Sequence, residues 1–271
     1  MTSSRITAAR TVVVQELLSD RDLQVIQALA RVRVASVRQL ERLFFVTTSP
    51  LSSSRQCQMT LERLSTWRVV TRLERRVGGP RAGSAGFIYS LDTLGQRIAG
   101  QAGPVGGSRP RRPWTPSYPF LKHALAVSEL FVRLVEVARV APFTIEAFEA
   151  EPGSWRAFTG SAGELVFLKP DAFVRLGAAE FTDSTFVEVD CGTESRTALA
   201  VKFERYRLYW ASGSEQRRHG VFPRALWLVP DRKRYQQLVD VAARQPAESW
   251  RLFKVALYDE AIHAMVGDGD G

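Results

Sequence analysis

A short stretch in the second half of the chain most restricts what this sequence can fold into. Ala172–Leu176 and Phe186–Asp190 are rich in β-branched and aromatic residues, and the polar break between them predicts two strands joined as a hairpin. Glu188 and Asp190 lie two residues apart, so their side chains point to the same face of the second strand. Asp171 directly precedes the first strand. If the strands pair antiparallel, these three carboxylates converge at one end of a sheet.

Three carboxylates on one face of a sheet repel one another unless a counter-charge is present. Oxygen ligands of this kind suit Mg²⁺ or Mn²⁺. Such an ion can hold a phosphodiester and activate a water molecule for attack. A plainer interpretation is that Asp171 caps a turn and that Glu188 and Asp190 line a solvated strand face. The spacing alone leaves both interpretations open.

The same segment resembles a known nuclease pattern. Pro-Asp at 170–171, a spacer of strand length and Glu-Val-Asp at 188–190 resemble the PD-(D/E)XK nuclease core. With Gly-Thr-Glu-Ser after the strand, and with Lys202 and Tyr206 on the next helix, the run is similar to the replication-relaxation family of plasmid and conjugative-element proteins. The resemblance covers most of the chain and is most specific over 168–206. It implies a winged helix followed by a nuclease-like domain.

The resemblance also implies roles for individual residues. Asp171, Glu188 and Asp190 would bind the metal ion and take part in catalysis. The nuclease pattern places a lysine two residues after the strand carboxylate, and Asp190 occupies that position here. Lysines moved to another element occur in this superfamily, so Lys202 on the next helix is the candidate to stabilise the transition state. If Lys202 does not take this role, the chain keeps the nuclease-like fold but does not cleave DNA.

The net charge of +9 is distributed unevenly along the chain. Residues 1–117 hold 18 Arg, no Lys and seven acidic residues, which gives +11, whereas the remainder carries −2. A basic excess confined to one part of a chain is typical of a nucleic-acid-binding domain. Arginine suits this role because its planar guanidinium group can bind phosphate with two hydrogen bonds.

The residue pattern of the first hundred residues predicts three helices and a β-hairpin. Helices are expected to begin at Ser19, at Ser36 and near Leu51, and residues 69–91 alternate as two strands around a glycine-rich tip. This is the order of a winged helix-turn-helix, whose recognition helix enters the major groove. DNA contacts are expected from the outer side of the third helix and from the basic hairpin, at Ser53, Ser54, Arg55, Gln58, Met59, Arg63, Arg75, Arg76 and Arg81.

These observations predict an α+β chain with two domains. A winged helix-turn-helix occupies residues 1–100 and opens with an irregular arm over the first 18 residues. A Gly-, Pro- and Arg-rich linker follows at 101–117. A nuclease-like α/β domain with a mixed sheet covers 118–265, and the tail at 266–271 is expected to be disordered.

The leading function is that of a DNA-binding protein of a plasmid or mobile element that nicks or relaxes DNA by hydrolysis dependent on Mg²⁺ or Mn²⁺. A variant uses Tyr206 or Tyr209 as the nucleophile. The alternative is a catalytically inactive accessory protein or transcriptional regulator, in which the nuclease-like domain serves dimerisation or DNA binding. The missing lysine at position 190 favours this alternative.

The sequence also suggests partners and a location. Duplex DNA is the main expected partner, and a second copy of the chain and other replication or conjugation proteins are further candidates. No stretch approaches the length of about 18 apolar residues that a membrane span needs, so no membrane partner is expected. The two cysteines, Cys57 and Cys191, have no spacing partner for zinc and fit a reducing cytoplasm.

Overall fold

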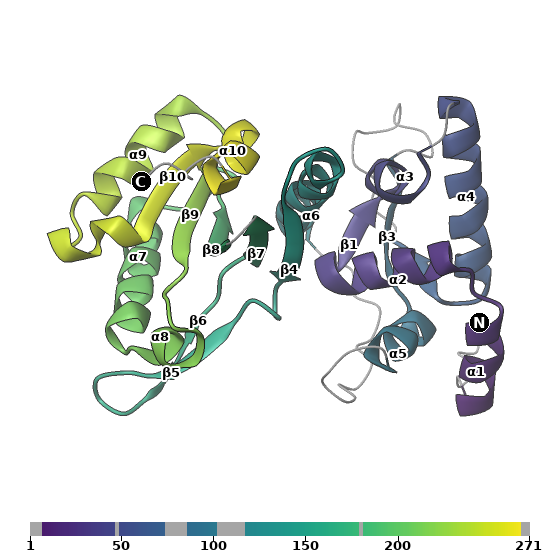
Figure 1. The fold of residues 1–271 in the computed structure, drawn as a ribbon, viewed down its shortest axis with the longest axis horizontal. Helices are drawn as coiled ribbons and strands as arrows, with labels where there is room; N and C mark the ends of the chain where they lie inside the picture. Colours follow the sequence, from purple (N-terminus) through teal and green to yellow (C-terminus); the bar gives the residue numbers. More distant parts are fainter. Residues whose placement is uncertain (1–6, 47–48, 74–85, 102–116, 179–180, 267–271) are drawn as a thin grey trace. The chain divides into compact units, whose positions relative to one another are not determined.

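The computed structural model describes residues 7–46, 49–73, 86–101, 117–178 and 181–266. Contacts divide the chain into two compact units, Met1–Val132 and Arg133–Gly271. Each unit combines helices with a β-sheet, which confirms the predicted α+β class (Figure 1). The boundary between the units falls within helix α6 (Tyr118–Ala138), so one helix contributes residues to both. The predicted linker lies almost wholly outside the described residues.

The first unit is built from helices around a small antiparallel sheet. Its strand order is β1 (Val34–Ser36), β3 (Ile88–Leu91) and β2 (Val70–Arg72). The helices that precede α6 are α1 (Ala8–Glu16), α2 (Asp20–Val32), α3 (Val37–Phe44), α4 (Pro50–Thr66) and α5 (Thr93–Gln101). Ser19 and Ser36 each cap a helix through a reciprocal capping box, which confirms both predicted helix starts.

The expected irregular arm at the N-terminus is instead partly helical. Helix α1 begins after Thr7, whose hydroxyl accepts a hydrogen bond from the Arg10 N–H, and it packs against α5. Thr11 and Val14 are its buried residues. The prediction was wrong because the partner that covers this face lies about eighty residues further along the chain.

The first half of α6 completes the core of the first unit. Ser128 donates a buried hydrogen bond to the Val34 carbonyl oxygen at 2.6 Å. Glu129 accepts hydrogen bonds from Arg42 at 2.5 Å and from Gln39 at 3.0 Å, both on α3. One hydrophobic cluster joins α6 to the sheet and consists of Val34, Leu73, Ile88, Leu121, Ala124 and Leu125. Residues beyond position 117 therefore belong to the fold of the first unit.

The second unit is organised around a five-stranded mixed sheet. The strand order is β10 (Phe253–Leu257), β9 (Arg224–Val229), β8 (Phe181–Val189), β7 (Ala172–Ala178) and β4 (Thr144–Ala150). The pairs from β4 to β8 are antiparallel, and the pairs from β8 to β10 are parallel. The remaining elements are the hairpin β5 (Arg156–Thr159) and β6 (Leu165–Leu168), and the helices α7 (Arg196–Ala211), α8 (Ser214–His219), α9 (Arg232–Ala242) and α10 (Ala261–Val266).

Strands β7 and β8 pair antiparallel, as the convergence of the carboxylates required, and Ala172 lies opposite Val187. The polar residues Asp183 and Ser184, expected in the turn, lie within β8 instead. They pair with Leu176 and Arg175, so ladder hydrogen bonds satisfy their backbone groups despite low strand propensity. Tertiary pairing therefore makes this strand longer than its local sequence predicts.

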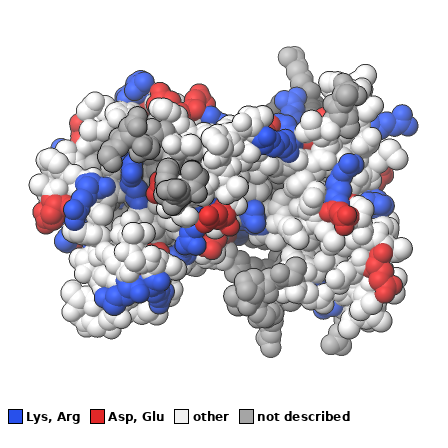
Figure 2. Space-filling model, in the orientation of Figure 1, with Lys and Arg blue, Asp and Glu red and all other residues white. Residues whose placement is uncertain are grey.

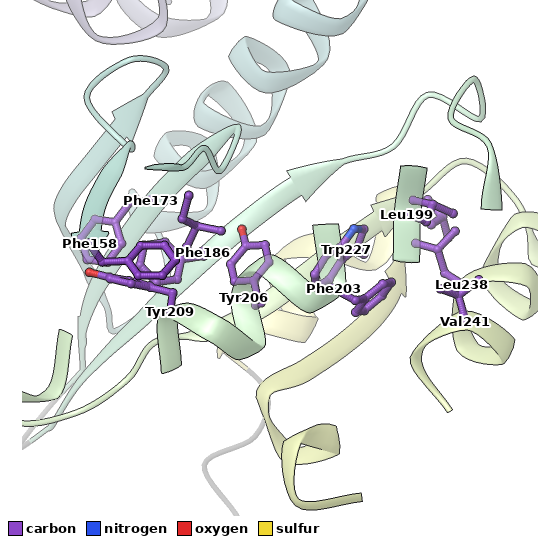
Figure 3. Packing of buried hydrophobic residues seen from close by; sticks show 13 residues of the cluster. Phe158, Phe173, Phe186, Leu199, Phe203, Tyr206, Tyr209, Trp227, Leu238 and Val241 are labelled. Atoms are coloured by element: carbon purple, nitrogen blue, oxygen red, sulfur yellow. The ribbon is translucent and has the colours of Figure 1, made fainter. Parts of the chain in front are cut away.

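Helices α7 and α9 pack on one face of this sheet through an aromatic core (Figure 3). Phe203 stacks on Trp227 with ring centroids 4.1 Å apart, and Tyr206 meets the same indole edge-on at 5.2 Å. All three side chains are fully buried. Because α7 is held so closely, its neighbouring polar residues take fixed positions over the end of β8. No helix in the described part of the chain is long and apolar enough to cross a membrane.

Candidate functional site

Three of the predicted site residues, Asp171, Glu188 and Lys202, come together at the edge of the sheet where β7 begins and β8 ends. Asp171 precedes β7, and one of its carboxylate oxygens accepts a hydrogen bond from the Val189 N–H at 2.7 Å. Glu188 lies on β8 and accepts hydrogen bonds from Lys202 at 3.0 Å and from the Tyr206 hydroxyl at 2.8 Å. Asp171 and Glu188 are 8% and 2% exposed. Lys202 thus reaches the strand carboxylate from α7, across one face of the sheet.

Asp190 is held by a different partner. One of its oxygens accepts a hydrogen bond from Arg234 Nε at 2.7 Å and lies 2.7 Å from Arg234 Nη2 in an ion pair, and the other accepts a hydrogen bond from the Gly192 N–H. Arg234 also donates to the Glu194 carbonyl oxygen at 2.8 Å. This buried ion pair ties the end of β8 to α9, so Asp190 is paired with Arg234, whereas Glu188 is paired with Lys202.

The third carboxylate near Lys202 is Glu194, which the sequence analysis did not single out. Its side chain lies 2.8 Å from the Lys202 ammonium group. Glu194 sits just before Ser195, the N-cap of α7. That position was the available signal, because a loop carboxylate there can fold back onto the helix that carries the lysine. We call Asp171, Glu188, Glu194 and Lys202 the carboxylate cluster.

The carboxylate cluster carries more negative than positive charge. Burial and the nearby Asp171 carboxylate raise the pKa of Glu188 to about 8, although Lys202 and Tyr206 oppose this shift. Burial alone would lower the pKa of Lys202, but the Glu188, Asp171 and Glu194 carboxylates outweigh burial and raise it. Both groups therefore hold their protons tightly, as expected where three acids share one ammonium group.

The donor set fits a divalent cation only in part. Carboxylate oxygens are the right kind of ligand for Mg²⁺ or Mn²⁺. In the cluster, however, a backbone N–H, Lys202 and Tyr206 already hydrogen-bond to the oxygens of Asp171 and Glu188. Among the described residues, no group of three or more His, Cys, Asp or Glu side chains is arranged to hold a metal ion. The predicted metal site therefore stays a prediction.

The two tyrosines considered as nucleophiles are fully buried. The Tyr206 hydroxyl donates to Glu188, and the Tyr209 hydroxyl donates to Glu215. Burial, together with these carboxylates, raises the pKa of both phenols. Both side chains are packed, hydrogen-bonded core residues, so a scissile phosphate cannot reach them in this conformation.

We expect Glu188→Gln to change the pH dependence of stability. Because the folded state keeps the Glu188 proton up to about pH 8, while an unfolded chain releases it near its ordinary pKa, the wild-type free energy of unfolding should fall as pH rises between these values. Glutamine cannot ionise, so the variant should gain on the order of 1–3 kcal/mol relative to wild type from pH 5 to 8. Urea denaturation at several pH values measures this difference.

Glu204→Gln is the matched control, on helix α7, which also carries Lys202. A hydrogen bond from Arg207 lowers the pKa of Glu204, so this residue stays ionised across the window and its effect should not vary with pH. An equal pH dependence of wild type and Glu188→Gln would contradict the raised pKa.

The second candidate site is the outward side of α4 in the first unit. Cys57, Leu61 and Leu64 lie on one side of the helix and are buried in the core. The opposite side carries an exposed stripe at helical spacing, which we call the α4 face and which consists of Leu51, Arg55, Gln58, Met59 and Glu62. Three of the predicted DNA contacts, Arg55, Gln58 and Met59, therefore do lie together on one exposed face.

The other predicted contacts on α4 have internal roles. Ser53 is buried and donates to the Ser49 carbonyl oxygen, so the expectation that it faces a ligand is corrected. Ser54 donates to Glu41 at 2.9 Å. Arg63 forms hydrogen bonds to both carboxylate oxygens of the buried Asp22, at 2.6 and 2.7 Å. The predicted hairpin contacts lie outside the described residues and are Arg75, Arg76 and Arg81.

Comparison with known proteins identifies the family. No curated protein and no solved structure shows significant similarity to the chain. A family model described as replication-relaxation matches residues 26–225 and so includes most of the first unit and the whole carboxylate cluster. Because this match covers well over half of the 271 residues, the chain belongs to the replication-relaxation family.

Proposed function

We propose that this protein binds duplex DNA through the α4 face of its first unit and acts in replication or relaxation of a plasmid or mobile element. Membership of the replication-relaxation family supports the role in replication or relaxation. The observation that carries DNA binding is the α4 face itself, which presents the exposed Arg55 on a chain segment with a net charge of +11. On this proposal the unit is a winged helix-turn-helix with α4 as the recognition helix.

Basic side chains beside the α4 face would add contacts with the phosphate backbone. On the visible side of each unit taken by itself, Figure 2 shows Lys and Arg side chains at several separate places, with Asp and Glu among them. Each arginine that binds a phosphate releases condensed counterions, so the affinity should fall steeply as salt rises. Spread positive charge of this kind gives the sequence-independent part of DNA affinity.

We expect Arg55→Ala to weaken duplex binding by the full-length protein without changing its melting temperature. Arg55 is exposed, so its loss removes a contact with the ligand and leaves the core intact. If it contacts a phosphate, the slope of log affinity against log salt should fall by about one unit. Fluorescence anisotropy with a labelled duplex at several salt concentrations measures both quantities.

Two arginines serve as controls. Arg10 is also exposed but lies on α1, outside the α4 face, so Arg10→Ala should weaken binding much less than Arg55→Ala. Arg63→Ala should instead lower the melting temperature, because it leaves the buried Asp22 carboxylate without its guanidinium partner. Duplex binding that is absent, or that does not respond to salt, would refute the proposal.

A second candidate function is metal-dependent nicking by a nuclease-like second unit. The observation in its favour is that Lys202 lies 3.0 Å from Glu188, beside Asp171, in place of the lysine missing at position 190. A divalent ion bound by Asp171 and Glu188 would supply a Lewis acid and an activated water molecule. Lys202 could then stabilise negative charge on the phosphate. The internal hydrogen bonds of the cluster favour the alternative, a catalytically inactive accessory protein.

A gel assay separates these two possibilities. Supercoiled plasmid is incubated with the protein and Mg²⁺ or Mn²⁺, with and without EDTA. If the second unit is a nuclease, nicked circles should accumulate only with the metal, and Asp171→Asn should abolish them while Glu204→Gln does not. Asparagine keeps an acceptor for the Val189 N–H, so the fold should persist. No metal-dependent nicking by wild type would leave the accessory role.

A further inference from the structure

The α4 face combines large apolar side chains with an arginine. Leu51 is 85% exposed and Met59 is 62% exposed. Together with Arg55 they follow a spacing of four residues, which places them in one row about 12 Å long on the helix surface. Two large apolar side chains exposed on the same face of one helix, with an arginine between them, offer both apolar and charged contacts to a ligand.

Two neighbouring polar side chains of α4, Ser54 and Arg63, bond to other residues of the protein. Ser54 bonds to Glu41, and Arg63 bonds to Asp22 and lies over the Trp67 ring. The α4 face thus presents two apolar side chains, Leu51 and Met59, beside the polar Arg55, Gln58 and Glu62. Phosphate groups are charged and solvated, so Leu51 and Met59 would make no favourable contact with the DNA backbone.

Base edges in the major groove do offer apolar contacts. The C5-methyl group of thymine is the apolar group that the groove presents, and arginine is the usual partner of guanine O6 and N7. We infer that α4 recognises a specific duplex sequence, in which thymine methyl groups pack against Leu51 and Met59 while Arg55 contacts a guanine. This inference rests on the proposed DNA-binding function and adds the class of DNA: a defined site rather than any duplex.

The test begins with selection of a target by the full-length protein from a randomised duplex library. Each thymine of the selected site is then replaced by uracil, which lacks only the methyl group. Loss of one buried methyl contact should weaken binding about fourfold. In Leu51→Ala, uracil at the position that Leu51 contacts should cause no further loss, because the methyl group has already lost its partner. Uracil outside the selected site should have no effect.

The outcomes separate this inference from the proposed function. Duplex binding without an enriched sequence, or a selected site that is insensitive to uracil, overturns the inference and leaves DNA binding intact. The absence of any duplex binding overturns both. Leu51 is exposed, so Leu51→Ala should keep the wild-type melting temperature. If Leu51→Ala instead alters the oligomeric state in ultracentrifugation and keeps the uracil sensitivity, the row is a protein interface and the inference is wrong.

Discussion

A fragment that ends at residue 101 should fail to unfold cooperatively, whereas one that ends at residue 138 should show a clear thermal transition. The shorter fragment lacks the half of α6 that supplies Leu121, Ala124 and Leu125 to the core of the first unit. It also lacks the Ser128 hydrogen bond and the Glu129 contacts to α3. Full burial of one leucine contributes about 1.5–3 kcal/mol, and a domain of this size is stable by only about 5–15 kcal/mol.

A matched pair of point variants tests, in the intact chain, whether α6 is part of the core of the first unit. Leu121 is 1% exposed, so Leu121→Ala should cost about 2–5 kcal/mol of unfolding free energy. Its neighbour Lys122 is exposed, so Lys122→Ala should cost less than about 0.5 kcal/mol. Circular dichroism melts and urea titrations measure both. If the two fragments melt at the same temperature, α6 is not part of the first unit's core and a winged helix-turn-helix over residues 1–100 would be complete by itself.

Arg234→Met should destabilise the second unit by about 3–5 kcal/mol, the range found when one partner of a buried ion pair is removed. The Asp190 and Arg234 side chains are 2% and 9% exposed, and the guanidinium group supplies a hydrogen bond and an ion pair to the carboxylate. Without it, Asp190 keeps the Gly192 N–H as a donor but remains a buried anion with no counter-charge. Urea denaturation monitored by tryptophan fluorescence measures the loss.

Two further variants make this prediction specific. The double variant Asp190→Asn, Arg234→Met should recover part of the lost unfolding free energy, because it removes the buried carboxylate charge together with its partner. Arg232 lies on the same helix as Arg234 and forms an exposed ion pair with Glu260. Arg232→Met should therefore cost at most about 1 kcal/mol. A loss below 1 kcal/mol for Arg234→Met would mean that Asp190 does not depend on this pair. Asp190 would then return as a candidate metal ligand beside Glu188.

Local sequence patterns determined the parts of the fold whose causes lie within a few residues. Ser19 and Ser36 each exchange hydrogen bonds with the residue three positions further along the chain, Asp22 and Gln39. Both helix starts could therefore be predicted from the local sequence. The inward row of α4 follows from helical spacing. The shared face of Glu188 and Asp190 follows from strand geometry, and both side chains indeed meet partners on the helices that cover one face of the sheet.

Tertiary structure decided which of those residues meet. Asp190 lies two residues from Glu188, yet it pairs with Arg234, 44 positions further along the chain, while Glu194 takes its place beside Lys202. Likewise, the sequence assigns residues 118–132 to the second domain, yet this half of α6 packs on β1 and β3 of the first unit. Periodicity identifies the face of an element that is buried, but not the element that covers it. That choice depends on the packing and charge pairing of segments far apart in the sequence.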